Sequence, residues 1–552
     1  MISITCDGAR IYLAGTSFFD RGKTGEIPGA HWDKAKRMWT YPATPLSAAQ
    51  VVVAFPEAGH DKATDDLVAE WQATVKMHGV LTGGIAPIDV PGAKLPLWDH
   101  QRRAVTFALN SRAFYAALDM GCGKTAVAIH TAILSGAKRI LVTCPLGVVP
   151  VWPAEFRKHT DEQALIVPLH TGSVKSKMQR ADAAFKASKP DDRVVLVINH
   201  ESLWREPFGE WALKQKFDII VSDEHHKSKS PGGRFSMFLA KLAKSAKKRL
   251  ALSGTPLSHS PLDAYGQWRF LDTGVFGSNF TRFRSKFAIM GGFGNYQVVG
   301  WQNSEEFQRR YELISYTVKS DDVQDLPETQ HIPIPVELGK AEIDLYRQLN
   351  TELVAEVQAG TVTAQNALTK LLRLAQVTGG AVGTDDHQLQ VVGTSKRDAL
   401  YDLVEAIPAH ESIVVFTRFI ADIESVKHVA AECKRQCFEI TGSAKQLDEW
   451  KACIAQTGKK PMPIIAVNIQ SGGLGIDLTM SHIAIYYSLG YSLGDYTQSL
   501  KRTHRPGQTR RVLYYHLLAS GTVDEEIMRA LEEKKDVIET MIGNRKAAER
   551  GV

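Results

Sequence analysis

Two long regions of the chain alternate short, almost uninterrupted apolar runs with longer stretches of helical pattern. The apolar runs lie at 113–118, 139–143, 194–198, 217–221 and 249–252 in the first region, and at 412–416, 464–467, 482–486 and 512–515 in the second. Strands that are apolar on both faces and separated by helices indicate parallel sheets covered by helices on both sides. The pattern therefore predicts an α/β protein with two separate parallel sheets.

The segments outside these two regions have other patterns. Short β-like runs predict a small β-rich unit at 1–60, in which 31–33 and 38–41 would form a hairpin around a basic turn. The Gly- and Pro-rich end of 61–94 is typical of a linker. We expect the first sheet at 95–261, a helical insertion at 262–330, the second sheet at 331–520 with a helical insertion near 341–380, and a C-terminal helix within 521–552.

A glycine turn joins the strand 113–118 to a helical stretch at 126–134. The turn ends in Gly121-Cys122-Gly123-Lys124-Thr125, which is the layout of a phosphate-binding loop. Its backbone N–H groups and the start of the helix would hold phosphate oxygens, Lys124 would neutralise the outer phosphates, and Thr125 could ligate Mg²⁺. The first glycine of the full motif is replaced by Leu118, so an ordinary turn between a strand and a helix remains an alternative.

An acidic pair, Asp223-Glu224, follows the strand 217–221. Ligands of parallel sheets bind at the carboxyl ends of the strands. Given the upstream loop, Asp223 would hold Mg²⁺ through water, and Glu224 would orient and deprotonate an attacking water. A solvated acidic turn is one alternative, and a zinc site at His225 and His226 is another, although adjacent histidines cannot easily share one metal. The hydroxyls of 253–255, after the next strand, could hydrogen-bond to the pair.

The second region has a glycine-rich loop at 471–478 and a basic element at 498–508. Arg502 and Arg505 lie three residues apart, so they share one helix face or flank the end of the helix. Two such guanidinium groups could reach a γ-phosphate as arginine fingers. A basic helix face that binds DNA is the alternative.

The composition is that of a soluble globular protein: 552 residues, 44% hydrophobic and 23% charged. The net charge of +6 is compatible with a polyanionic partner without establishing one. Six scattered cysteines favour a reducing compartment. Cys433 and Cys437 have no second Cys/His pair at metal spacing nearby, so we expect no zinc site there. The N-terminal residues do not resemble a signal peptide, and we expect no membrane span.

The order of the motifs resembles that of superfamily-two helicase motors. The shared motifs are Leu97-Trp98-Asp99-His100-Gln101, the glycine turn, Thr143-Cys144-Pro145-Leu146, the acidic turn, 253–256, Val415-Phe416-Thr417-Arg418-Phe419, the glycine-rich loop and the Arg502–Arg505 element. The ending His504-Arg505-Pro506-Gly507-Gln508 is similar to the Swi/Snf-type branch of DNA translocases, as are 255–261, 326–328 and 371–376. The resemblance covers about 95–540.

The resemblance implies two RecA-like lobes that bind ATP and Mg²⁺ between them. Gln101 would read the adenine, and the loop residues Gly121 to Thr125, with Gly475 and Asp477, would hold the nucleotide. Lys124, Asp223, Glu224, Arg502 and Arg505 would be catalytic, and Thr125 and Asp223 would be the metal residues. DNA contacts would come from the following positions: Pro145, Asn199, His200, Thr417, Arg418, Ser471 and Gly472.

Leu118 agrees with the family, in which the first glycine of the phosphate loop is usually missing. Other positions depart from the family pattern. Relatives usually have Ala or Gly at the position of His225, often Gly at that of Lys501 and often Ile at that of Pro506. Tyr316-Thr317-Val318-Lys319 stands where relatives carry an Arg-Arg pair before Leu-Pro, which puts a regulatory contact there in doubt.

The N-terminal stretch 27–41 resembles the HARP module of annealing helicases. Trp32 and Trp39 frame a basic turn and could stack on bases, for instance at a fork. A small β-unit with the tryptophans in its core is the alternative.

The combined motifs predict a DNA-dependent ATPase that translocates on double-stranded or forked DNA, independent of sequence, and remodels or anneals it. Three alternatives are a strand-separating DNA or RNA helicase, the motor subunit of a restriction or repair complex, and a DNA-binding scaffold with an inactive ATPase. We expect a monomer in a bacterial or phage-infected cytoplasm, associated with the nucleoid, rather than a nuclear protein.

Overall fold

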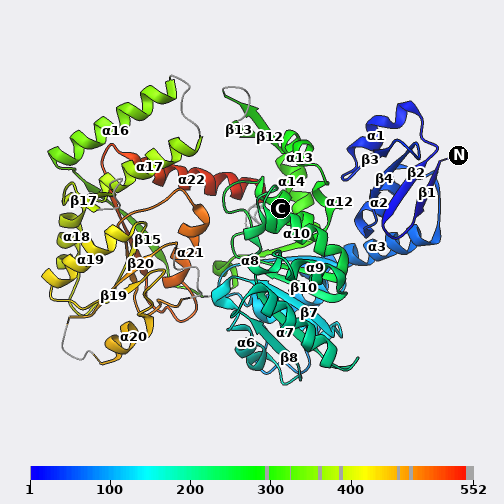
Figure 1. Ribbon diagram of the computed structural model, residues 1–552, viewed down its shortest axis with the longest axis horizontal. Coiled ribbons are helices and arrows are strands. Elements are labelled where there is room, and N and C mark those ends of the chain that lie inside the picture. Colours follow the sequence, from blue (N-terminus) through cyan, green and yellow to red (C-terminus); the bar gives the residue numbers. More distant parts are fainter. Residues whose placement is uncertain are drawn as a thin grey trace. The chain divides into compact units, whose positions relative to one another are not determined.

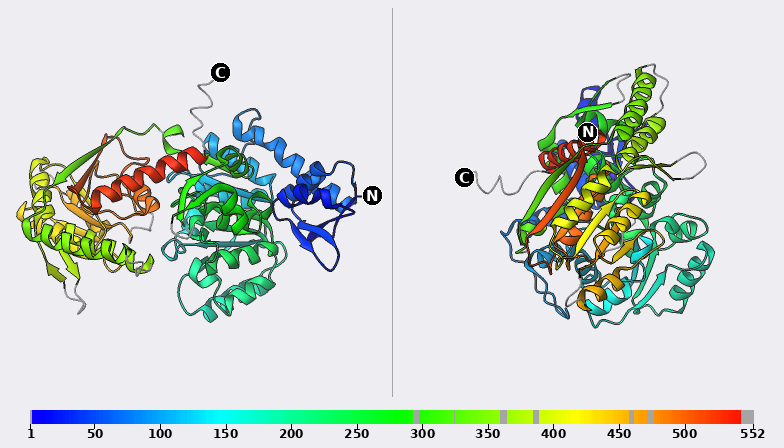
Figure 2. Two further views of the ribbon diagram at one scale, coloured as in Figure 1. Left: turned by 90° about the horizontal axis from the view of Figure 1, so that it is seen from above. Right: turned by 90° about the vertical axis from the view of Figure 1, so that its left-hand side faces the viewer.

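The computed structural model describes residues 2–292, 297–323, 325–358, 364–383, 389–456, 461–470 and 476–542 (Figures 1 and 2). The chain forms two compact units. Unit 1 comprises Met1–Val323 together with Val537–Val552, and unit 2 comprises Gln324–Asp536.

The N-terminal part of unit 1 is a five-stranded sheet in the order β3-β4-β2-β1-β5. Its strands are β1 (Ser3–Cys6), β2 (Arg10–Ala14), β3 (His31–Asp33), β4 (Met38–Pro42) and β5 (Gly59–His60). The helical elements of this part are η1 (Phe18–Asp20), α1 (Arg21–Glu26) and α2 (Pro45–Ala54). The predicted hairpin is present, with Trp32 opposite Trp39 in the β3–β4 register.

The stretch 61–94 contains a long helix, α3 (Lys62–Thr82). The Asp61 side chain caps its first turn by accepting from the Thr64 N–H at 2.9 Å, and Gly83 ends it with a φ of 91°. Leu67 lies in the core of the N-terminal sheet, whereas Leu81 lies in the core of the next sheet. A continuous helix therefore joins the two cores, and the Gly- and Pro-rich end of the stretch follows it.

The larger part of unit 1 is a seven-stranded, entirely parallel sheet in the order β14-β6-β11-β10-β7-β9-β8. Its strands are β6 (Ala113–Leu118), β7 (Arg139–Cys144), β8 (Leu165–Leu169), β9 (Val194–Asn199), β10 (Phe217–Asp223), β11 (Ala246–Leu252) and β14 (Ser315–Val318). The helical elements around it are α4 (Asp99–Leu109), α5 (Lys124–Leu134), η2 (Leu146–Val148), α6 (Trp152–His159), α7 (Val174–Ala187), α8 (His200–Leu203), α9 (Phe208–Lys214), η3 (His225–Ser228), α10 (Arg234–Leu242) and η4 (Ala243–Ser245). Two apolar clusters fill the two faces of the sheet, as its apolar strands predict.

Residues 262–330 are mostly helical. The helices are α11 (Asp263–Leu271), α12 (Thr273–Phe276), α13 (Phe280–Phe287), α14 (Ser304–Glu312) and α15 (Ser320–Val323). The stretch also contains an antiparallel ribbon, β12 (Ala288–Gly291) and β13 (Gln297–Trp301). Strand β14, from this same stretch, forms one edge of the seven-stranded sheet beside β6.

Unit 2 is built on a six-stranded parallel sheet in the order β15-β22-β21-β18-β20-β19. The strands are β15 (Thr329–Val336), β18 (Ile413–Thr417), β19 (Cys437–Ile440), β20 (Ile464–Asn468), β21 (Ile483–Tyr486) and β22 (Val512–Ala519), and a separate ribbon pairs β16 (Ala381–Gly383) with β17 (Leu389–Val391). The helices are α16 (Lys340–Gln358), α17 (Ala364–Thr378), α18 (Ser395–Ala406), α19 (Ile420–Glu432), α20 (Leu447–Gln456), α21 (Leu493–Thr503) and α22 (Val523–Ile542), of which α22 continues past Asp536 into the C-terminal part of unit 1. The prediction of two parallel-sheet α/β units and a β-rich N-terminal part is confirmed.

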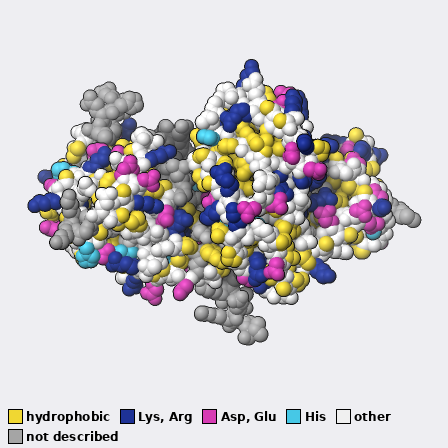
Figure 3. Space-filling view, turned by 90° about the horizontal axis from the view of Figure 1, so that it is seen from below, with side chains coloured by type: hydrophobic (Ala, Val, Ile, Leu, Met, Phe, Trp, Pro, Cys, Tyr) yellow, Lys and Arg dark blue, Asp and Glu magenta, His cyan; other side chains and the backbone are white. Residues whose placement is uncertain are grey.

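The surface mixes charges of both signs. In the space-filling view of Figure 3, basic and acidic side chains are interspersed around apolar areas, in keeping with a net charge of only +6. Within the described residues, no helix combines the length and the apolar character that crossing a membrane requires.

Candidate nucleotide site

The glycine turn between β6 and α5 has the backbone of a phosphate loop. Gly121 and Gly123 both have a φ of 83°, which a residue with a Cβ rarely adopts. A Cβ on Gly123 would also collide with the Gln101 side chain. Gly123 directly precedes the first residue of α5, so N–H groups of the helix start are left for an anion.

Lys124 folds back onto the loop in this structure. Its Nζ donates to the carbonyl oxygens of Leu118 at 3.0 Å and Asp119 at 3.3 Å. Gly254 lies against it, since a Cβ there would be 3.5 Å from the Lys124 Nζ. The ammonium group thus sits between the glycine turn and the Ser253–Pro256 turn that follows β11.

The predicted acidic pair ends β10. Asp223 is buried, and its Oδ1 accepts from the Glu224 N–H at 3.0 Å. Burial and the neighbouring Glu224 carboxylate raise the pKa of Asp223 to about 7, although Lys124 and a hydrogen bond from Trp152 act in the opposite direction. The cations and hydrogen-bond donors around Asp223 therefore do not offset the cost of burying its charged form.

Glu224 is held in the left-handed region, with φ 48° and ψ 49°. This conformation is uncommon for a residue other than glycine and typically costs on the order of 1 kcal/mol or more, so the surrounding contacts must fix it. The Glu224 Oε2 lies 3.2 Å from Nδ1 of His226. That same Nδ1 lies 3.0 Å from the Ser253 Oγ, which also accepts from the Thr255 N–H at 3.1 Å.

The strand register brings these groups together. In the parallel sheet, Asp223 pairs with Leu252 of β11, and Leu252 pairs with Ala116 of β6. The glycine turn, the acidic pair and the Ser253 turn therefore follow the carboxyl ends of three adjacent strands. The predicted link between the 253–255 hydroxyls and the acidic pair exists for Ser253, and His226 forms the bridge.

Gln101 lies beside the loop, and its side-chain amide hydrogen-bonds to the protein backbone. Its Oε1 accepts from the Trp98 N–H at 3.0 Å, and its Nε2 donates to the Cys122 carbonyl at 3.2 Å. The same carbonyl lies 2.9 Å from Nε2 of His100. Cys122 itself is buried, so it would meet phosphate only through its backbone. Gln101 supports the loop in this structure, and adenine recognition stays a prediction.

The positions expected to touch DNA in unit 1 differ in exposure. Pro145 is partly exposed just after β7. Asn199 and His200 are buried: Asn199 Oδ1 accepts from Lys177 Nζ at 2.9 Å, and His200 Nδ1 lies 2.9 Å from the Thr143 Oγ1. Both side chains are buried inside the unit, so a contact with DNA from this stretch would have to use other atoms.

In unit 2, Arg502 lies in the last turn of α21 and Arg505 in the turn that follows. Arg502 is buried, whereas Arg505 is partly exposed. Gln508 fixes this turn, because its Nε2 donates to the carbonyl oxygens of Thr479, Ser481 and Thr503 at 3.0–3.2 Å. The two arginines thus flank a helix end, one of the two arrangements that their spacing allows.

Asp477 braces the same region. Its Oδ1 accepts from both N–H and Oγ1 of Thr479, at 3.0 and 2.8 Å. Burial acts to raise the pKa of Asp477, but these hydrogen bonds and the charges of Arg505 and Lys451 outweigh it and lower the pKa. Ser471, Gly472 and Gly475, also predicted to bind DNA or nucleotide, lie outside the described residues.

The remaining predicted DNA contacts in unit 2 are Thr417 and Arg418. Thr417 is fully buried at the end of β18. Arg418 is half-buried, with its guanidinium 5.7 Å from the ring centre of Phe419, and burial lowers its pKa despite the nearby Asp495 and Asp422. Of the two, only Arg418 presents a side chain that could meet a phosphate.

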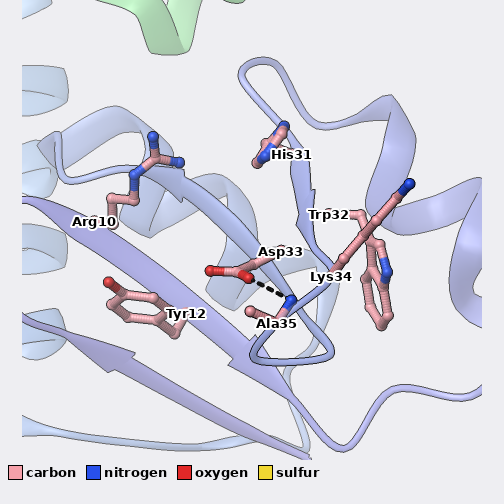
Figure 4. A pocket seen from close by; sticks show the side chains of 7 residues that line it. All are labelled: Arg10, Tyr12, His31, Trp32, Asp33, Lys34 and Ala35. Carbon is pink, nitrogen blue, oxygen red and sulfur yellow. Dashed lines mark hydrogen bonds between the residues drawn. The ribbon is translucent and has the colours of Figure 1, made fainter.

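The N-terminal sheet carries a hollow of about 520 Å³ (Figure 4). Its lining is basic and aromatic: Arg10, Tyr12, His31, Trp32, Asp33, Lys34 and Ala35. Lys36 lies 4.2 Å from the Tyr12 ring centre, and Trp32 packs edge-on against Trp39 at 5.5 Å. Asp33 accepts from the backbone N–H groups of Lys36 and Ala35, which lowers its pKa, so its charge serves the turn. Trp32 is 38% exposed, so this aromatic is available at the rim.

Several residues at the site were not identified from sequence. Trp152 hydrogen-bonds to Asp223, and the Ser320 N–H and Oγ donate to Asp119 of the glycine turn at 3.0 and 3.2 Å. They are far from the motifs along the chain and carry no local signature. The role of His226 could have been inferred, because it follows the acidic pair directly. His225 and His226 have different partners, which argues against the shared zinc site.

Comparison with known families covers most of the chain. The SNF2-related domain matches residues 100–379, just over half of the chain, and the helicase conserved C-terminal domain matches residues 395–507.

Individual relatives are distant. An uncharacterised ATP-dependent helicase of Mycoplasma genitalium is 24% identical over 76% of this chain and 39% of its own length. Protein p41 of Acyrthosiphon pisum secondary endosymbiont phage 1 is 28% identical over 77% of this chain and 93% of its own length. The DNA annealing helicase and endonuclease ZRANB3 of Bos taurus is 23% identical over 81% of this chain. The chain spans about 40% of the length of the Mycoplasma and bovine relatives.

Proposed function

The chain belongs to the SNF2-related family and is an ATP hydrolase of the superfamily-two helicase type; from this premise we propose that it is a DNA-dependent ATPase that translocates on double-stranded or forked DNA and remodels or anneals it. The observation that carries the proposal is the convergence of Lys124, the Asp223-Glu224 pair and Ser253 at the carboxyl ends of three adjacent strands. A scaffold with an inactive ATPase would have no need to keep Glu224 in a strained conformation.

Each residue then has a chemical role. The N–H groups of Gly121 to Thr125 would bind phosphate oxygens, and Lys124 would exchange its two carbonyl partners for phosphate oxygens. Glu224 would orient the attacking water and accept its proton. His226 would hold the Glu224 carboxylate in place and connect it to Ser253, because its Nδ1 lies within hydrogen-bond distance of both side chains.

The donor set also fits Mg²⁺. The raised pKa of Asp223 shows that burial and Glu224 leave this carboxyl short of positive charge, and a divalent cation would supply it. Thr125 and Asp223 would hold the ion, with the remaining positions taken by water and substrate oxygens, as is usual for Mg²⁺. When bound, the ion would neutralise charge that develops on the phosphates.

Arg502 and Arg505 would add cations that stabilise the transition state. Arg505 is the better candidate for a direct contact with the phosphates because it is partly exposed. Arg502 is buried and therefore also contributes to the packing of α21.

We infer that the N-terminal hollow contributes a DNA contact. Lys36 lies over the Tyr12 ring, and Arg10 and Lys34 line the same hollow as Tyr12 and Trp32. Cations beside aromatic rings suit a nucleotide with an exposed base. Such a contact would favour forked over fully paired DNA. The printed name of the bovine relative, a DNA annealing helicase, is compatible with this substrate.

The test is the ATP turnover rate with single-stranded, duplex and forked DNA at several salt concentrations. We expect duplex and forked DNA to stimulate turnover, and higher salt to weaken the stimulation, because phosphate contacts would dominate binding. Equal turnover with and without DNA would contradict the proposal. A strand-displacement assay distinguishes a true helicase, because a translocase leaves a simple duplex intact.

A further inference from the structure

The His225 ring has other partners than that of its neighbour His226, which lies against Glu224. Its ring is completely buried between Tyr115 and Phe270, with ring centres 5.8 and 5.2 Å away. The family resemblance gives Ala or Gly at this position, neither of which could make the contacts of an imidazole. The proposed ATPase roles therefore leave this buried polar ring unexplained.

Hydrogen bonds define how the His225 ring is held. Nε2 lies 3.1 Å from the Gln267 carbonyl oxygen, which can only accept, so Nε2 carries the proton. The Ser228 Oγ lies 3.2 Å from the same Nε2. Nδ1 then accepts from the Ser222 Oγ at 2.8 Å. The ring thus ties the last residues of β10 to the middle of α11.

Helix α11 lies unusually close to the acidic turn. A Cβ on Gly266 would stand 2.5 Å from the carbonyl oxygens of both Ser228 and Lys229, so only glycine permits this approach. The approach brings the Gln267 carbonyl within reach of the His225 ring.

Gln267 connects the same helix to the other parts of the site. Its Nε2 donates to the carbonyl oxygens of Pro256 at 2.5 Å and Asp263 at 3.0 Å, and its Oε1 accepts from the Tyr115 hydroxyl at 2.6 Å. Tyr115 belongs to β6, which leads into the glycine turn. One residue of α11 thus contacts β6, the Ser253–Pro256 turn and, through His225, the acidic turn.

We propose that His225 is a positioning residue for ATP hydrolysis, which anchors the left-handed Glu224 to helix α11 so that its carboxylate keeps a fixed place. The inference rests on the proposed role of Glu224 as the residue that activates water. A general base must lie within hydrogen-bond reach of its proton, and a displacement of about 1 Å can cost roughly 100-fold in rate. Nucleotide binding, which depends on the glycine turn, would not need the anchor.

The main test is His225→Phe, which keeps the ring contacts with Tyr115 and Phe270 but removes every hydrogen bond of the imidazole. We expect kcat for ATP hydrolysis to fall about 10- to 100-fold, while the Kd for a fluorescent ATP analogue stays within about twofold of the wild-type value. His225→Gln, whose amide can still donate to the Gln267 carbonyl, should recover most of the lost rate. Ser222→Ala, a small change that removes only the Nδ1 partner, should lower kcat several-fold and serves if His225→Phe does not fold.

The matched control is Phe270→Leu. This change loosens packing on the same ring without removing a hydrogen bond, so it should lower the melting temperature and leave kcat nearly unchanged. The proposal is overturned if His225→Phe and Ser222→Ala keep wild-type kcat, if Phe270→Leu lowers kcat as much as His225→Phe, or if His225→Gln is as slow as His225→Phe. Glu224→Gln is measured in parallel: if it still hydrolyses ATP, the assignment of Glu224 fails, whereas an inactive Glu224→Gln beside a fully active His225→Phe refutes only the anchor.

Discussion

The pKa values of Asp223 in unit 1 and Asp477 in unit 2 are shifted in opposite directions, although both units are built on parallel sheets. Asp223 is buried beside a second carboxylate, and its pKa is raised to about 7. Asp477 accepts two hydrogen bonds from Thr479 near Arg505, and its pKa is lowered. The hydrogen bonds and cations around Asp223 do not offset the effect of burial and of Glu224 on its pKa. Those around Asp477 outweigh the effect of burial.

This difference is the one expected between a carboxyl that binds a cation and a carboxylate that serves the structure. A buried carboxyl with too little compensation destabilises the protein alone and gains most from an added cation. A carboxylate with satisfied hydrogen bonds and nearby cations, such as Asp477, stabilises its own turn at Thr479. The comparison therefore supports the proposal that a metal ion would bind in unit 1, whereas unit 2 would contribute guanidinium groups.

The largest expected effect comes from removing the proposed base in unit 1. Glu224→Gln keeps the size of the side chain but cannot accept a proton, so the hydrolysis rate should fall by up to about 10⁴-fold. Phosphate release under saturating ATP measures it. Glu210→Gln, which removes an exposed carboxylate paired with Lys214 at 2.7 Å, is the control and should hydrolyse ATP normally.

In unit 2, Arg505→Ala should reduce hydrolysis by roughly 10³-fold, the usual scale for loss of an arginine finger. Binding of ATP should persist, because the phosphate loop is in unit 1. Arg510→Ala is the matched control, since Arg510 lies in the same turn and donates to both Glu411 oxygens at 2.8 Å. It should lower stability without slowing hydrolysis, and equal losses of rate in the two variants would refute the special role of Arg505.

The two aspartates themselves should give stability changes of opposite sign in the absence of divalent cations. The folded pKa of Asp223 is raised from 3.8 to about 7, so its charged form opposes folding, and this cost grows as the pH rises from about 4 through 7. Asp223→Asn should therefore stabilise the protein at pH 8 and have little effect near pH 4.

Asp477→Asn should destabilise the protein at pH 8, by roughly 1 kcal/mol, because it weakens the hydrogen bonds from Thr479. The lowered pKa means that this contribution is present above the usual carboxyl range and is lost as the pH falls through the folded pKa. Thermal unfolding with EDTA at pH 4, 6 and 8 measures both variants. A destabilised Asp223→Asn protein at pH 8 would contradict the comparison.

The interior strands of both sheets could be predicted because they are apolar on both faces. The edge strands were harder, for a physical reason. Proline is tolerated in an edge strand, because one side of that strand has no neighbouring strand to which a backbone N–H must donate. A proline within an apolar run makes the strand harder to recognise in the sequence. Strand β8 contains Pro168, and β15 contains Pro333 and Pro335; each lies at an edge of its sheet. Strand β14 is hidden for another reason, because it is short and follows a long helical stretch.

The place of the candidate residues along the strands could be predicted from the sequence, whereas most of the contacts around them could not. Lys124, Asp223 and Glu224 occupy local motifs whose strand–turn context fixes their place, and the sheet register does bring those strands together. The hydrogen bonds from Ser320 to Asp119 and from Gln267 to Pro256 depend on tertiary packing alone. The burial of Asn199 and His200 likewise follows from β9 lying inside the sheet, which the family motif does not encode.

The smallest expected effect concerns the N-terminal hollow. Trp32→Ala combined with Lys34→Ala should weaken stimulation of ATP turnover by forked DNA roughly tenfold, because a stacking face and a cation are lost. Turnover without DNA should not change. Val53→Ala, at a 79%-exposed position of α2 outside the hollow, is the control.

Point variants are preferable here to deletion of residues 1–60. Thr44 hydrogen-bonds to the buried Asp272, and Leu46 lies in the same apolar cluster as Trp268. A deletion would expose this apolar surface and remove a partner of Asp272, so it would disturb the larger sheet as well. If the double variant and Val53→Ala respond alike to forked DNA, the hollow is not a DNA contact.

We propose that ATP hydrolysis at the unit 1 site drives movement along duplex DNA. Displacement of a third strand from a DNA triplex tests it directly, because the third strand is removed only by a motor that travels along the underlying duplex. We predict ATP-dependent displacement by the wild-type protein and none by Glu224→Gln, with no separation of the duplex itself. Wild-type ATP hydrolysis without displacement, or displacement that Glu224→Gln retains, would contradict the account.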